Sequence, residues 1–146
     1  MDNAIQLFAA LAGSFGFAAL FNLHGKKLAF AALGGLLSWS VYLLLEHWNV
    51  DAYACAFAAS VALTLYAELM ARCHKSPVTV FLVTAAIPLI PGAGLYRTVN
   101  YLMLRSSELA TSEGLHTLLF AASMSAGITL TTLIFQILQK SLRRCH

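Results

Sequence analysis

The chain has 146 residues, of which 60% are hydrophobic and only 10% carry a charged side chain. A soluble domain usually has about 25% charged residues, so this composition excludes a protein whose surface faces water. It predicts an integral membrane protein. The small net charge of +3, with no basic patch among aromatic residues, excludes a nucleic-acid-binding role.

Five apolar segments separated by short polar loops are expected to cross the bilayer as helices. About 20 apolar residues in a helix span the hydrocarbon core, which is about 30 Å thick. We therefore predict an all-α membrane protein with one polytopic domain over residues 1–146. The predicted spans are 4–21, 28–45, 52–70, 77–104 and 115–138, and the fourth of them is discontinuous.

The second and third spans carry polar or aromatic residues near one end. Trp39, Tyr42 and Trp48 are typical of the aromatic belt at a membrane interface. Glu68 and Arg72 lie one helical turn apart, and the simplest interpretation is an interfacial ion pair that contributes roughly a few tenths of a kcal/mol. The alternative is a proton-binding or substrate-binding carboxylate, because acidic groups inside membranes commonly carry function.

Two prolines and two glycines interrupt the fourth span, at Pro88, Pro91, Gly92 and Gly94. Proline has no N–H and its ring collides with the carbonyl four residues earlier, so these prolines should free the carbonyls of Thr84 and Ile87. Residues 77–90 would form a helix only about 21 Å long. The crossing is therefore complete only if the chain continues through residues 95–104.

The half-helix that resumes after the break is the predicted binding site. Its start offers N–H groups and the positive end of a helix dipole, which suit an anion. Arg97, expected in its first turn, can bind a carboxylate with two hydrogen bonds. The predicted substrate-binding residues are Gly92, Gly94, Tyr96, Arg97, Thr98 and Asn100. The alternative is a plain proline kink, or a loop at the membrane edge with Arg97 reaching toward lipid headgroups.

The last part of the chain is expected to be a polar loop over residues 105–113, then a fifth span and a basic tail. The fifth span carries Ser123, Gly127 and Thr131 at four-residue spacing. Small and polar residues at this spacing usually make contacts between membrane helices, and less often line a substrate path.

The cysteines and histidines do not indicate a metal or a cofactor. Cys55, Cys73 and Cys145 are an odd number without paired spacing, so we expect reduced thiols. The five histidines lie at loops and ends without a metal-binding spacing. No aspartate lies inside a predicted span and no phosphate-binding glycine loop with lysine is present, so neither an enzyme nor an ATP-driven pump is expected.

Basic residues set the predicted orientation. Loops 22–27 and 71–76 and the tail after residue 139 hold seven of the nine lysine and arginine residues, all on one side of the membrane. Basic loops stay on the cytoplasmic side, so the N-terminus should be outside and the C-terminus inside.

The segment IPLIPGAGLYRTVN, with Pro88, Pro91, Gly92, Gly94 and Tyr96, resembles the core of the threonine/serine exporter family. The whole chain looks like the small subunit of the split, two-protein form of that family. The resemblance implies export of threonine and serine, or of a dicarboxylate such as succinate, across a bacterial plasma membrane.

The resemblance also implies a larger membrane subunit as partner, because five spans enclose little volume for a pathway. A homo-oligomer is the alternative assembly. The alternative function is a non-transporting membrane subunit that assembles or stabilises another protein.

Overall fold

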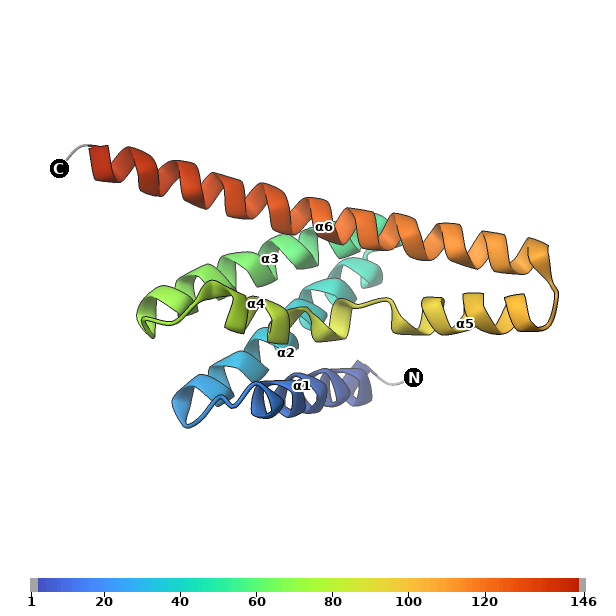
Figure 1. The fold of residues 1–146 in the computed structure, drawn as a ribbon, viewed down its shortest axis with the longest axis horizontal. Coiled ribbons are helices and arrows are strands. Elements are labelled where there is room, and N and C mark those ends of the chain that lie inside the picture. Colours follow the sequence, from blue (N-terminus) through green and yellow to red (C-terminus); the bar gives the residue numbers. More distant parts are fainter. Residues whose placement is uncertain (1–2, 145–146) are drawn as a thin grey trace.

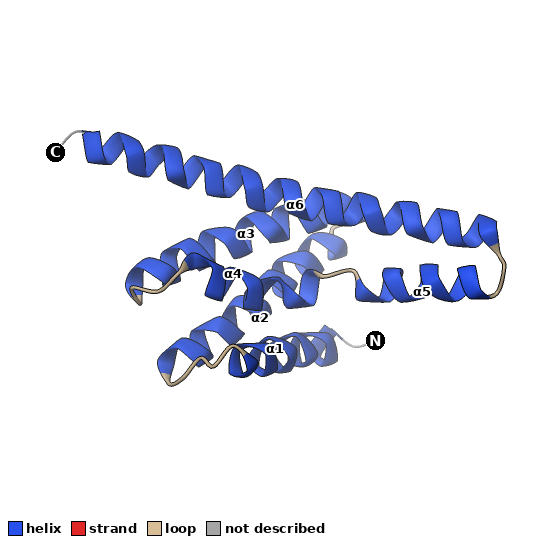
Figure 2. Ribbon diagram, viewed as in Figure 1, coloured by secondary structure: helices blue, strands red, loops and turns tan. Residues whose placement is uncertain are grey.

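The computed structural model describes residues 3–144, and the side chains of residues 3–140. Within these residues every regular element is a helix, as Figures 1 and 2 show. The elements are α1 (Asn3–Leu20), α2 (Lys26–His47), α3 (Ala52–Cys73), α4 (Val78–Ala86), the short 3-10 helix η1 (Ile87–Leu89), α5 (Gly92–Met103) and α6 (Ser107–Arg144).

Among the described residues, four helices, α1, α2, α3 and α6, are long and apolar enough to cross a membrane. The segment from α4 through η1 forms a pair with α5 that is bent by 54°, and the pair makes a fifth span if it is counted as one. This confirms the predicted all-helical membrane fold with an interruption in its fourth segment. The predicted orientation stays a prediction.

The centre of the bundle is α3, which contacts α2, α4 and α6. Half of the residues in the apolar 18-residue stretch of α3 are buried, compared with 17% in the matching stretch of α1 and 11% in that of α6. The exposed remainder of the bundle is largely apolar, as expected for a surface that faces lipid or another membrane subunit.

Small residues bring the helices together. A Cβ on Gly35 of α2 would overlap the side chain of Ser14 of α1, and a Cβ on Gly127 of α6 would overlap Ser60 of α3. Such residues let helix backbones approach closely in membranes, where no hydrophobic force drives helices together. Gly127 and Thr131 are both buried, so this part of the polar face of α6 is a helix contact.

The predicted loop over residues 105–113 is wrong. Only residues 104–106 connect α5 to α6, and Arg105 takes a left-handed conformation with φ of 57°. α6 begins at Ser107, with the Ala110 N–H bonded to the Ser106 carbonyl at 3.0 Å. Glu108 in the first turn favours this start because a negative charge stabilises the N-terminal end of a helix dipole.

As a result, α6 has 38 residues and is about 57 Å long, which is much longer than the hydrocarbon core. The predicted fifth span, 115–138, lies within it. α5 lies antiparallel to the first part of α6, and the two extend beyond the ends of α2 and α3 (Figure 1). We refer to α5 and residues 107–120 of α6 as the α5–α6 hairpin.

Candidate functional site

At the break between α4 and α5 the backbone forms a 3-10 turn, η1, and does not leave the Ile87 carbonyl free. The Ile87 carbonyl accepts a hydrogen bond from the Ile90 N–H at 3.3 Å, within the 3-10 turn. The prediction that Pro91 leaves this carbonyl free is therefore wrong, because a bond to the third residue replaces the missing bond to the fourth. The Ala85 carbonyl is also occupied, by the Ser38 hydroxyl of α2 at 2.8 Å.

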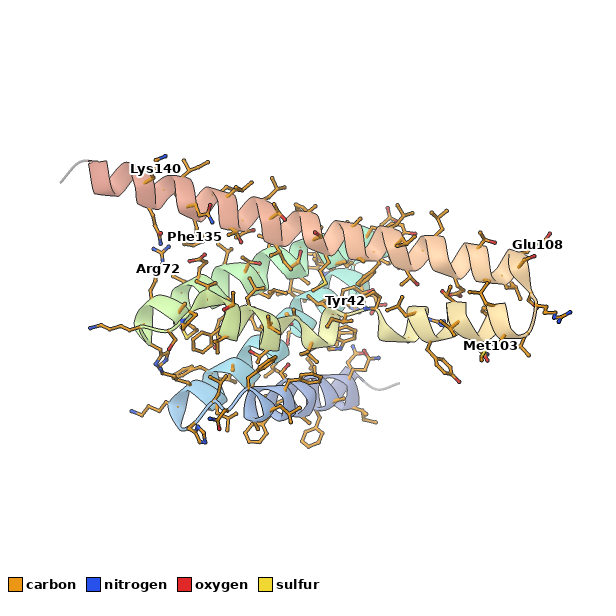
Figure 3. The ribbon with its side chains drawn as sticks, viewed as in Figure 1. Tyr42, Arg72, Met103, Glu108, Phe135 and Lys140 are labelled. Atoms are coloured by element: carbon orange, nitrogen blue, oxygen red, sulfur yellow. The ribbon has the colours of Figure 1, made fainter. Side chains whose placement is uncertain are left out.

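A pocket of about 350 Å³ borders the break, with walls from α2, η1, α5 and α6. We call it the break pocket, and its residues are Trp39, Tyr42, Pro88, Leu89, Ile90, Pro91, Gly92, Ala93, Gly94, Arg97, Glu113, His116, Thr117 and Phe120. Figure 3 shows Tyr42 near the connection that leads to α5. The volume is in the range of small-molecule sites, which are about 300–1,000 Å³.

One wall of the break pocket is aromatic. The rings of Trp39 and Tyr42 are stacked with centroids 5.0 Å apart, and Phe120 lies 6.1 Å from Tyr42. Trp39 Nε1 is buried and has no hydrogen-bond partner among the described residues. Trp39 and Tyr42 both line the pocket, and their expected position at a membrane interface stays a prediction.

The start of α5 forms the polar part of the opposite wall. First-turn N–H groups of a helix lack a partner within the helix. The N–H groups of Gly92 and Leu95 donate to the carbonyls of Ile90 and Pro91, at 2.7 and 3.1 Å. Among the described residues no backbone carbonyl accepts from the N–H groups of Ala93 and Gly94, and both residues line the pocket.

Arg97 supplies the positive charge of the break pocket. It lies in the second turn of α5, not in the first as predicted, because the helix begins at Gly92. Its Nε donates to the Ala93 carbonyl at 3.4 Å and lies 3.8 Å from Oε2 of Glu113 on α6. The Arg97 side chain is 56% exposed and that of Glu113 is 33% exposed. An exposed pair of this kind usually contributes only about 0.2–1 kcal/mol.

The six predicted substrate-binding residues separate into two groups. Gly92, Gly94 and Arg97 line the break pocket, whereas Tyr96, Thr98 and Asn100 do not. Tyr96 is 72% exposed and Asn100 is also exposed.

Thr98 packs against α6, and Gly94 does so as well as lining the pocket. A Cβ on Gly94 would overlap Thr117, and a Cβ on Gly114 would lie 3.3 Å from Thr98. The Thr98 hydroxyl donates to the Gly94 carbonyl at 2.8 Å. This close contact holds the hairpin together and positions Arg97 opposite Glu113.

Sequence reasoning missed Glu113 and His116, which also line the break pocket. Glu113 lies in the expected loop over residues 105–113, whereas His116 lies at the start of the predicted fifth span. If residues 107–140 are read as one helix, Glu113, Thr117 and Phe120 share a face, at spacings of four and three residues.

The second predicted polar pair, Glu68 and Arg72, lies away from the break pocket. Its charged atoms are 3.4 Å apart, and Glu68 is buried. The Arg72 guanidinium also lies over the ring of Phe135 of α6, 4.9 Å from its centroid. Figure 3 shows Arg72 and Phe135 at the end of the bundle where Lys140 lies, at a distance from Tyr42.

Within residues 3–140 no three histidine, cysteine or acidic side chains lie close enough to hold a metal ion. Cys55 is a buried free thiol and Cys73 an exposed one. Cys145 lies outside the described residues.

No solved structure matches this chain. The model of the family described as threonine/serine exporter, ThrE, matches residues 6–134. The match includes both halves of the fourth segment and every residue of the break pocket. Because it covers most of the sequence, the chain belongs to the threonine/serine exporter family.

Proposed function

We propose that the chain is a subunit of a secondary exporter of small metabolites that carry a carboxylate. The substrate would be threonine and serine or a dicarboxylate such as succinate, and the membrane would be a bacterial plasma membrane. The observation that carries the proposal is the position of Arg97. It lines a pocket of about 350 Å³ at the point where a membrane helix stops and resumes.

The groups around the break pocket suit a carboxylate. The guanidinium of Arg97 can donate two parallel hydrogen bonds, and the first-turn N–H groups of α5 add the positive end of the helix dipole. A Cβ on Gly92 would meet no atom within 4 Å, so a ligand can approach this part of the backbone. The aromatic wall of Trp39 and Tyr42 would cover the apolar part of the substrate.

We further propose a larger membrane subunit that covers the α5–α6 hairpin. No residue of α5 is buried, although the helix carries large apolar side chains at Leu95, Val99, Leu102 and Met103. The hairpin extends beyond the ends of α2 and α3 (Figure 1). A second membrane subunit would bury this surface and close the pathway, whereas a second copy of the chain is the competing arrangement.

The test is the export of threonine, serine and succinate from cells that contain the Arg97→Ala variant. We expect export to fall to the background level, because no other arginine or lysine among the described side chains lines the break pocket. The amount of the variant in the membrane and the partner that copurifies should be unchanged. Arg105→Ala, in the turn after α5, is the control and should export normally.

Normal export by Arg97→Ala would contradict the proposed site. If the amount of the partner subunit in the membrane falls along with export, the result would instead support the alternative function, a non-transporting subunit that stabilises another protein.

A further inference from the structure

Arg97 and Glu113 face each other across the border of the break pocket, from two different helices. Their charged atoms are 3.8 Å apart, which is close enough for attraction but long for a hydrogen bond. Both side chains are partly exposed, so the free energy of the pair is small. A ligand that offers a charge to each partner can therefore replace this pair at little cost.

A zwitterionic amino acid carries the two charges that such a replacement needs. We propose that Glu113 binds the ammonium group of an α-amino acid while Arg97 binds its carboxylate, and that Glu113 exchanges this ammonium for a proton. The substrate would enter between the two side chains and keep both of them paired. This inference rests on the proposed export function and assigns a role to a residue outside the family motif.

The same arrangement discriminates against a dicarboxylate. Its first carboxylate can pair with Arg97, but its second would meet the negative charge of Glu113. Among the described side chains, no other arginine or lysine lines the break pocket to compensate, and His116 is the only histidine there. Like charges brought together in this way favour one substrate class over the other.

Proton exchange follows from competition at one carboxylate. A protonated Glu113 carries no charge to attract an ammonium group, so the proton and the amino acid exclude each other. When the amino acid leaves, the Glu113 carboxylate can take a proton from the water on that side. The proton departs when the next ammonium group arrives from the other side, so one proton moves against one amino acid.

Other ionisable groups also face this position. They are Arg97 on α5, Tyr42 on α2 and His116 on α6, and all three line the same pocket. The ring of Tyr53 of α3 lies 5.1 Å from that of His116. His116 lies close to Glu113 in the sequence and is a second group that can bind a proton, so the test must separate the two residues.

The experiment measures ligand affinity of the purified full-length chain, together with any subunit that copurifies with it. Three ligands serve as probes. L-threonine carries both charges, β-hydroxybutyrate is the same skeleton without the amino group, and succinate carries a second carboxylate. The wild-type protein should prefer threonine to each of the other two by about tenfold or more, the effect expected of one charge-assisted contact.

Glu113→Gln should weaken threonine binding by about tenfold while it leaves β-hydroxybutyrate binding within about twofold. Glu113→Asp keeps the charge and should retain most of the preference. Glu108→Gln, at the start of the same helix and outside the pocket, is the matched control. Arg97→Gln should weaken all three ligands.

The pH dependence provides a second readout. Threonine affinity should fall as the pH is lowered, because a proton then occupies Glu113. Glu113→Gln should remove this dependence, and His116→Asn should keep it.

An unchanged ratio of threonine to β-hydroxybutyrate affinity in a folded Glu113→Gln variant would overturn the inference. The Arg97–Glu113 pair would then be an ordinary surface ion pair, and the proposed export function would stand. If the wild-type protein and its partner bind none of the three probes, the proposed function itself fails.

Discussion

Two arginine–glutamate pairs lie at different places in this bundle, and their surroundings differ. Glu68 and Arg72 belong to one helix and are 3.4 Å apart, with the carboxylate buried and the guanidinium over Phe135. Arg97 and Glu113 belong to two helices, are 3.8 Å apart and border a pocket. We infer that the first pair stabilises the contact between α3 and α6 through Arg72, and that the second pair is available to a ligand.

The largest expected effect on export comes from exchanging the charges of the Arg97–Glu113 pair. The double variant Arg97→Glu with Glu113→Arg keeps an ion pair between α5 and α6 but reverses its direction in the pocket. Threonine would then meet the wrong charge at both ends, so we expect its export rate to fall by about a hundredfold or more. The measurement is export of labelled threonine at equal membrane levels of protein. Near-normal export would show that this pair only joins the two helices.

Changes to the Glu68–Arg72 pair should lower the stability of the protein and should not directly affect transport. Arg72→Ala leaves the buried Glu68 carboxylate without its partner and removes the contact with Phe135. We expect a loss of about 1–3 kcal/mol in the free energy of unfolding. The measurement is thermal unfolding in detergent, with Arg105→Ala as control and export normalised to folded protein. A stable variant that fails to export would assign Glu68 and Arg72 to the transport mechanism instead.

The features of the fold that could be predicted from the sequence are those that depend on residues close together in the chain. The spans follow from runs of apolar residues, and the break follows from the missing N–H groups of Pro88 and Pro91. The Glu68–Arg72 contact follows from a spacing of four residues within one helix.

The position of Glu113 could not be predicted in the same way. Residues 107–113 are mostly polar and fall in the predicted loop, although Glu108, Leu109 and Ala110 favour a helix. The contact with Arg97 joins two helices, and it depends on the close approach of Gly94 to Thr117. The sequence alone does not show which face of α5 meets α6, so the predicted site also includes Tyr96 and Asn100.

The smallest predicted effect concerns the backbone at the break. Ser38→Ala removes the hydroxyl that donates to the Ala85 carbonyl of α4 at 2.8 Å. We expect a loss of about 1 kcal/mol in the free energy of unfolding, with both charge pairs intact. Ser40→Ala is the matched control, since that exposed hydroxyl bonds only within its own helix, to the Leu36 carbonyl. Equal stability of the two variants, by thermal unfolding in detergent, would show that the Ser38 bond does not hold the break in place.

The central claim is that substrate occupies the break pocket, and protection of a single thiol tests it directly. Gly92→Cys would be introduced after replacement of Cys55, Cys73 and Cys145 by serine, and labelled with a membrane-impermeant maleimide. Gly92 lines the pocket and has room for a side chain, whereas Glu108→Cys at the tip of the hairpin provides an exposed control. We predict that an exported substrate slows labelling at position 92 and leaves labelling at position 108 unchanged. Equal labelling at position 92 with and without a substrate that the same preparation exports would contradict the account.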